Sequence, residues 1–137
     1  MMTETNLKEI LKTLFSIDDE HLLPITTNWF VPEIKPGTKE DIIGYRTQSK
    51  SLKEEKGRKY LRVNFRLSFV GEHAEELSQE VLLWQCDEKM DSLFEKYNIQ
   101  IDYAGMSVFS YPIKDSDKIA WIVDLSTKSF LDKEEGV

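Results

Sequence analysis

The stretch YLRVNFRLSFVG, residues 60–71, alternates apolar and polar positions more strictly than any other part of the chain. Successive side chains of a strand point to opposite faces, so this pattern predicts a strand with one buried face. The residues predicted to be buried are Leu61, Val63, Phe65, Leu67 and Phe69. The opposite face carries Arg62, Asn64, Arg66 and Ser68. The alternation leaves open whether this face contacts water, a nucleic acid or another copy of the chain.

Two helices are predicted by apolar residues that recur every three or four positions. The first ends near Ile17, before the acidic connector DDEH at residues 18–21, and its apolar residues are Leu7, Ile10, Leu11 and Leu14. The second follows Gly71 and carries its apolar stripe to about Asn98. A single helix of roughly 25 residues would be about 37 Å long.

Four further segments have the alternation, or the β-branched and aromatic residues, that favour strands. They are residues 25–34, 42–49, 99–113 and 119–127. Pro32 restricts the first segment to a sheet edge or a bulge, and a change of phase at or after Gly105 predicts a bulge in the third. The charged residues 50–59 are expected to form the mobile tip of a long hairpin.

The predicted order of elements is therefore α-β-β-β-α-β-β. Connections of hairpin length favour antiparallel neighbours, so the order indicates a single α+β domain over residues 1–137. We expect a mainly antiparallel sheet with the helices packed on one face. The ordered core is expected over about residues 6–127, followed by a polar tail over residues 128–137.

The charge of the chain argues against a nucleic-acid-binding protein. Its 18 basic and 25 acidic residues give a net charge of −7, whereas non-specific binding to phosphates rests on a cationic surface. Basic residues do gather on the second face of the strand at 60–71 and toward the hairpin tip. A surface for nucleic acid would interleave them with exposed aromatic residues, and Tyr60 is the one such residue there. A surface that faces solvent or another subunit is favoured. The residues of a possible subunit or partner interface are Lys53, Arg58, Tyr60, Arg62 and Arg66.

The sequence has no recognised catalytic or cofactor motif. It contains no glycine-rich nucleotide loop and no nucleophile elbow, and its six glycines are scattered singly. The DDEH connector could collect a divalent cation, but a solvated loop is the favoured interpretation. Asp87 and Glu88 disfavour a reactive thiolate at Cys86, which is expected to be a buried or half-buried structural cysteine. We therefore expect no catalytic residue, no metal and no cofactor, and an enzyme is disfavoured.

Cysteine usage and hydropathy suggest a cytoplasmic protein without a membrane segment. Cys86 is the single cysteine, so the chain has no internal disulfide, as is typical of proteins in a reducing compartment. No apolar run approaches the roughly 20 residues that span a bilayer. The N-terminal MMTETNLKEI lacks the basic-then-apolar order of a signal peptide.

Several motifs occur in a recognisable order. The strand LRVNFRLSFVG leads directly to a helix that starts EHAEEL, and an IQIDY strand with SVFSYP and a closing WIVDLS strand follow. Over about residues 6–127 this order resembles the neck and tail terminator proteins of tailed bacteriophages and prophages. These are also called tail completion or head-to-tail joining proteins, and their small α+β subunits have the same element order and length.

The resemblance implies a structural role in virion assembly. Such proteins form a ring, usually hexameric, that caps the full-length tail tube and joins the tail to the head. The implied partners are other copies of the chain, the tail tube protein and a head-completion or connector protein. DNA would pass through the ring without sequence-specific binding. The protein would be assembled in the bacterial cytoplasm and lie at the tail–head junction of the virion.

A different class of function fits the same pattern of elements. An α+β sandwich with an exposed charged hairpin also suits recognition of a peptide or a protein. The alternative is therefore a monomeric protein-binding adaptor, or a small regulator of a bacterial host.

Overall fold

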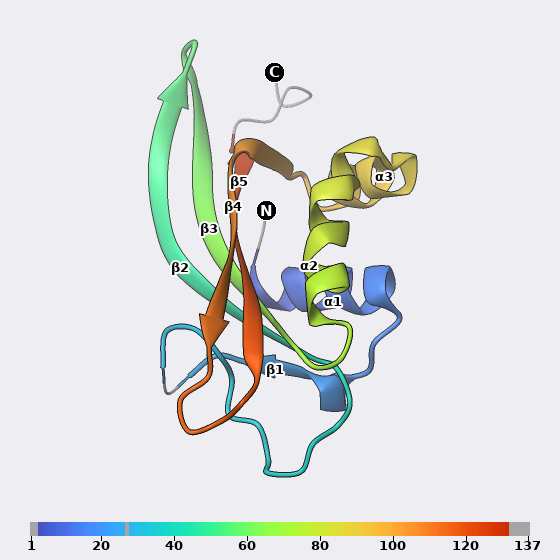
Figure 1. Ribbon diagram of the computed structural model, residues 1–137. Helices are drawn as coiled ribbons and strands as arrows, with labels where there is room; N and C mark the ends of the chain where they lie inside the picture. Colours follow the sequence, from blue (N-terminus) through green and yellow to red (C-terminus); the bar gives the residue numbers. More distant parts are fainter. Residues whose placement is uncertain (1–2, 27, 132–137) are drawn as a thin grey trace.

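The computed structural model describes residues 3–26 and 28–131 and has the predicted α+β class and element order (Figure 1). Within these ranges the α-helices are α1 (Glu4–Phe15), α2 (Ala74–Leu83) and α3 (Glu88–Lys96). The strands are β1 (Leu22–Pro24), β2 (Ile42–Glu55), β3 (Arg58–Val70), β4 (Gln100–Pro112) and β5 (Ile119–Phe130). Short 3₁₀ helices cover Asp19–His21 and Trp84–Cys86 and are labelled η1 and η2.

The strands form one sheet in the order β1-β2-β3-β5-β4. Every pairing is antiparallel except that of β1 with β2, which is parallel and sets Leu22 opposite Ile43. The mainly antiparallel sheet is thus confirmed. The register of β4 against β5 shifts between Asp102 and Ser107, so the irregularity expected near Gly105 is also confirmed.

The strand expected over residues 25–34 is wrong. The strand in this region, β1, ends at Pro24, and the segment after residue 27 is irregular. The Asn28 side chain accepts hydrogen bonds from the backbone N–H groups of Phe30 (2.8 Å) and Val31 (2.7 Å). Such local bonds replace a strand ladder, and the proline at position 32 has no N–H to offer one.

The single long helix predicted after Gly71 is also wrong, because it is divided into α2 and α3. The backbone of Asp87 is extended, and its side chain accepts a hydrogen bond from the N–H of Lys89 (2.9 Å), which caps the start of α3. The apolar stripe nevertheless continues through the break. Trp84 in η2 and Met90 and Phe94 in α3 are all buried in the same core.

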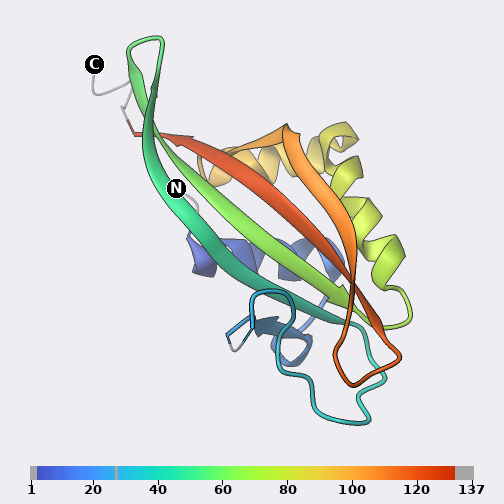
Figure 2. The same ribbon diagram turned by 60° about the vertical axis from the view of Figure 1, so that its left-hand side comes forward.

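Strands β2 and β3 form the predicted long hairpin, but they stay paired almost to its tip, where the sequence predicted a mobile segment over residues 50–59. They pair from Ile42 opposite Val70 to Glu55 opposite Arg58, leaving only Lys56 and Gly57 in the turn. Both turn residues have positive φ angles, 50° and 79°, as a two-residue turn of type I′ requires. Residues 50–59 are therefore strand apart from the turn, and we call them the arm. Figure 2 shows the arm extending beyond the rest of the sheet.

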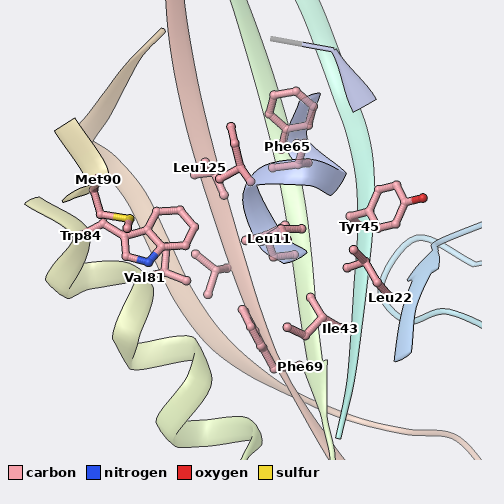
Figure 3. Packing of buried hydrophobic residues seen from close by; sticks show 14 of the residues in the cluster. Leu11, Leu22, Ile43, Tyr45, Phe65, Phe69, Val81, Trp84, Met90 and Leu125 are labelled. Atoms are coloured by element: carbon pink, nitrogen blue, oxygen red, sulfur yellow. The ribbon is translucent and has the colours of Figure 1, made fainter. Parts of the chain in front are cut away.

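The hydrophobic core lies between the sheet and the three helices, which cover one face as predicted (Figure 3). The apolar residues of β3 reach into it, and Val63, Phe65, Leu67 and Phe69 are completely inaccessible to solvent. Leu61, nearest the arm, is half-buried. Burial of each such side chain contributes about 1.5–3 kcal/mol to stability, which makes β3 the centre of the fold.

The segment 28–34 covers part of the opposite face of the sheet. Phe30 stacks on Tyr111 of β4 with ring centroids 4.4 Å apart, and Val31 joins Ile122 in a second apolar cluster. Gly44 of β2 makes room for this segment, since a Cβ atom there would lie 2.6 Å from Cδ of Pro32. The second face is thus apolar at the end near β1 and polar toward the arm.

The chain after residue 127 was expected to be a polar tail. Strand β5 continues to Phe130, three residues beyond the predicted end, and pairs with β3 as far as Tyr60. The rest of the predicted tail, residues 132–137, lies outside the described residues.

A polar contact fixes the connection from β3 to α2. Asp41 accepts a hydrogen bond from the backbone N–H of His73 (2.9 Å), and its other carboxylate oxygen lies 2.8 Å from Nδ1 of the same residue. Gly71 lies directly against Asp41, with a φ angle of 133° that side chains rarely adopt. The hydrogen bond to Asp41 raises the pKa of His73 above its ordinary value of 6.5.

This contact predicts a pH dependence of stability. Because the folded-state pKa of His73 is raised, its contribution is fully present below about pH 6.5 and is lost as the pH rises through the folded-state pKa. We expect Asp41→Asn, which keeps an oxygen for the N–H of His73, to lower the pKa of His73 and to weaken this dependence. NMR titration of the imidazole measures the pKa, and an equal pKa in both proteins would contradict the assignment.

The close approach at Gly44 predicts a difference between two strand glycines. Gly44→Ala should lower the free energy of unfolding by about 1–3 kcal/mol, because the added methyl group must displace the segment at Pro32. Gly105→Ala is the matched control, since its Cβ would meet nothing nearer than 3.6 Å, and it should change stability by about 0.5 kcal/mol or less. Denaturant unfolding measures the stability of both variants. Equal effects would show that segment 28–34 can shift to accommodate the added methyl group without a loss of stability.

Candidate protein–protein interface

The five residues predicted to form an interface lie on one face of the sheet. Arg58, Tyr60, Arg62 and Arg66 occupy alternate positions of β3, and Lys53 stands opposite Tyr60 on β2. Directly paired residues share a face, which here is the one turned away from the helices. The structure therefore brings the five together on one face of two neighbouring strands, but their surroundings differ.

Arg66 is engaged within the chain. Its Nε and Nη2 atoms donate to the two carboxylate oxygens of Asp124 on β5, at 2.7 and 2.8 Å, and Nη1 donates to the backbone carbonyl of Trp29 at 3.0 Å. The guanidinium also lies over the ring of Phe30, 4.7 Å from its centroid. With 12% of its side chain exposed, Arg66 holds segment 28–34 on the sheet and offers little surface to a partner.

Arg62 links three strands. Its Nη1 atom donates to Oγ of Ser126 on β5 (2.5 Å) and lies 3.3 Å from Oδ2 of Asp102 on β4. The side chain is 23% exposed. Like Arg66, this residue pairs its charge with a carboxylate of its own sheet.

Aromatic residues alternate with cations at the base of the arm. Tyr60 packs edge-on against Phe130 of β5, with centroids 5.6 Å apart, and Lys128 lies 4.7 Å from the Tyr60 centroid. The guanidinium of Arg58 lies 4.0 Å above the Phe130 ring. Phe130 could not be assigned to this site from the sequence, because it comes from a strand that is distant along the chain. Since Tyr60 is buried and a cation covers Phe130, these rings are poorly placed to stack on nucleotide bases.

The arm beyond this base is exposed and basic. Lys53 is exposed, and so is Leu52, which lies on the other side of the hairpin with 60% of its surface accessible. Within the described residues, Lys53 forms no ion pair. The arm carries five of the 18 basic residues and two of the 25 acidic ones, a net charge of +3. The rest of the chain then has 13 basic and 23 acidic residues, a net charge of −10.

A second exposed surface lies where α2 meets η2. Leu82 and Leu83 are 39% and 63% exposed, and Cys86 beside them is exposed as well, which corrects the expectation of a buried or half-buried thiol. The break in the helix explains this exposure, since η2 turns Trp84 inward and leaves Cys86 outside the core. The sequence signal that could have found the surface is that both leucines fall outside the stripe of Leu77, Val81 and Trp84.

The acidic connector at residues 18–21 is not arranged as a metal site. The carboxylate of Asp19 pairs with Lys8 (3.4 Å) and Lys12 (3.2 Å), which lower the pKa of Asp19, and Asp18 lies 2.6 Å from Nδ1 of His21. Across residues 3–26 and 28–131, no three His, Cys, Asp or Glu side chains are grouped so that they could hold a metal ion. In the same ranges, no helix is long and apolar enough to cross a membrane.

Comparison with protein families and curated proteins gives no relative from which to transfer a function. The sequence matches no protein-family model and no curated protein. The candidate interface therefore rests on its own geometry.

The contacts of Arg66 predict a structural role that Lys53 lacks. Arg66→Ala should lower the free energy of unfolding by about 2 kcal/mol, because it leaves the Asp124 carboxylate without its two hydrogen bonds. Lys53→Ala, the matched control, should change stability by about 0.5 kcal/mol or less. In a double-mutant cycle with Asp124→Ala, the two effects should fall short of additivity by about 1 kcal/mol. Strictly additive changes in the free energy of unfolding would show that the Arg66 and Asp124 side chains do not stabilise each other.

Proposed function

We propose that this chain is the subunit of a ring-forming virion assembly protein of the tail terminator type. In this role the ring caps the tail tube of a bacteriophage or prophage and joins it to the head. The protein is then a structural component of the tail–head junction and not an enzyme. Its partners are other copies of itself, the tube protein and a head-completion or connector protein.

The observation that carries the proposal is the separation of charge between arm and body. A basic arm attracts the acidic body of another copy, whereas contacts between two arms or between two bodies repel. Such attraction joins two different surfaces, so the contact is head-to-tail. Head-to-tail contacts generate closed rings or open filaments, while a two-fold dimer needs a self-complementary surface.

The shape of the subunit supports the same assembly. A two-stranded hairpin is marginally stable by itself in water, so an arm extending beyond the sheet gains stability when it packs on a neighbour. Figure 1 shows this arm at one end of the molecule, clear of the three helices. The resemblance in element order to phage tail terminators then selects a virion ring among the possible head-to-tail assemblies.

The acidic balance of the body is compatible with passage of DNA. A cationic lumen would hold the phosphate backbone and slow its movement, whereas an acidic surface would not bind it. Two cations of the second sheet face, Arg66 and Arg62, are paired with carboxylates of the chain. We therefore assign the DNA no specific binding site on the subunit.

Assembly on tail tubes tests the proposal. The purified chain is mixed with tubes of the tail tube protein from the same genome and examined by electron microscopy, with native mass spectrometry at increasing protein concentration. We expect rings at tube ends and a concentration-dependent oligomer, or a monomer that becomes a ring only on tubes. A monomer at every concentration that binds no tube end would reject the ring and favour the monomeric adaptor.

A further inference from the structure

We infer that the arm of one copy docks on the α2–η2 corner of the next copy, with Leu52 of the arm packed against Leu82 and Leu83. This inference rests on the proposed function, because it names the two surfaces that would meet in the ring. The corner is defined by Leu82, Leu83 and Cys86 together with the exposed carboxylates of Glu80, Asp87 and Glu88.

Leu52 is the one apolar side chain of the arm, whose other side chains are charged except for Ser51. It lies on the side of the hairpin that faces the helices, because it pairs with Leu61, whose side chain contacts the core. The helices end before they reach it, so Leu52 keeps 60% of its surface in water. On the same side of the hairpin lie Lys50, two residues before it, and Lys59, which pairs with Glu54, and within the described residues neither lysine forms an ion pair.

The α2–η2 corner has the complementary character. Leu83 is as exposed as Leu52, at 63%, and with Leu82 it forms an apolar step on a helix whose outer face has no partner among the described residues. Between residues 72 and 95 the chain exposes eight carboxylates and one lysine. Within the part of the chain that the structure describes, none of these carboxylates takes part in an ion pair.

Charge identifies a second copy of the chain as the occupant. An arm with a net charge of +3 would be repelled by another arm, and a corner rich in carboxylates would be repelled by another corner. An arm on a corner pairs opposite charges at the rim and buries apolar side chains at the centre, as protein interfaces do. The arm tip lies away from α2 and α3 of its own copy in both views, so the contact must be between copies (Figures 1 and 2).

Cross-linking tests the contact with a thiol that the chain already has. Leu52→Cys places a second thiol on the arm, and a short bis-maleimide can then join it to Cys86 of a neighbouring copy. Because each copy contributes both groups, we expect a ladder of covalent oligomers on a denaturing gel. Leu52→Cys with Cys86→Ser should run as a monomer on the same gel, as should Ser116→Cys, whose new thiol is in the exposed turn between β4 and β5.

Association of the uncross-linked protein provides an independent readout. Leu52→Ser should raise the dissociation constant of self-association at least about tenfold, as expected from loss of a buried leucine. Ile119→Ser is the matched control, because Ile119 is similarly exposed (53%) but lies far from the arm along the sheet, and it should leave the constant unchanged. Circular dichroism verifies that both variants are folded. Equal constants for the two variants would overturn the docking.

The outcomes separate this inference from the proposed function. A ladder that needs both the thiol introduced by Leu52→Cys and the thiol of Cys86 supports the docking of arm on corner. Rings or oligomers that form without a cross-link between these two positions would overturn the docking and leave the ring intact. Dimers from the variant with both Leu52→Cys and Cys86→Ser would show arm-to-arm contact and overturn it too. Absence of any oligomer, in solution or on tubes, would overturn both.

Discussion

The strict alternation of β3 is the constraint on which the rest of this structure depends. Every second side chain of this strand must lie in the core beneath the helices, and the intervening ones must therefore face the other way. Two arginines are among the latter, and a charge on a sheet face that is partly covered needs a partner. Asp124 and Asp102 supply the partners, which joins β3 to β5 and β4 by side chains as well as by the backbone ladder.

The two ends of the sheet differ in how far their faces are covered by other parts of the chain. At one end both sheet faces are covered, by helices on one side and by segment 28–34 on the other. At the other end β2 and β3 continue past this cover, and their alternating residues meet water on both sides. Cations lie above aromatic rings at the boundary, where Lys128 and Arg58 cover Tyr60 and Phe130. What continues beyond the boundary is a basic arm on an acidic body, and the proposed head-to-tail contacts between copies rest on this asymmetry.

The sequence could predict the candidate interface only in part. The five chosen residues share a face because alternation and hairpin pairing follow from local pattern. Whether each is available to a partner depends on residues distant in sequence. Arg66 is bound to Asp124 and to the backbone carbonyl of Trp29, and Arg58 lies over the ring of Phe130. The residues next to these arginines in the sequence do not predict such contacts. Leu82 and Leu83 were missed although both fall outside the apolar stripe of α2, whereas the exposure of Cys86 was missed because an unbroken helix was expected.

The sequence by itself determined the α+β class, the order of elements and the buried face of β3, because each follows from a repeat of two or of three to four residues. It also predicted a hairpin with its tip within residues 50–59, although the charged residues there suggested a mobile loop and the structure has paired strands with a turn at Lys56 and Gly57. Only the tertiary structure decided where the long helix breaks, that segment 28–34 lies on the sheet without joining it, and which arginines are paired. Those outcomes depend on packing at Gly44, capping at Asp87 and ion pairs across strands. Such contacts join residues that no local pattern connects.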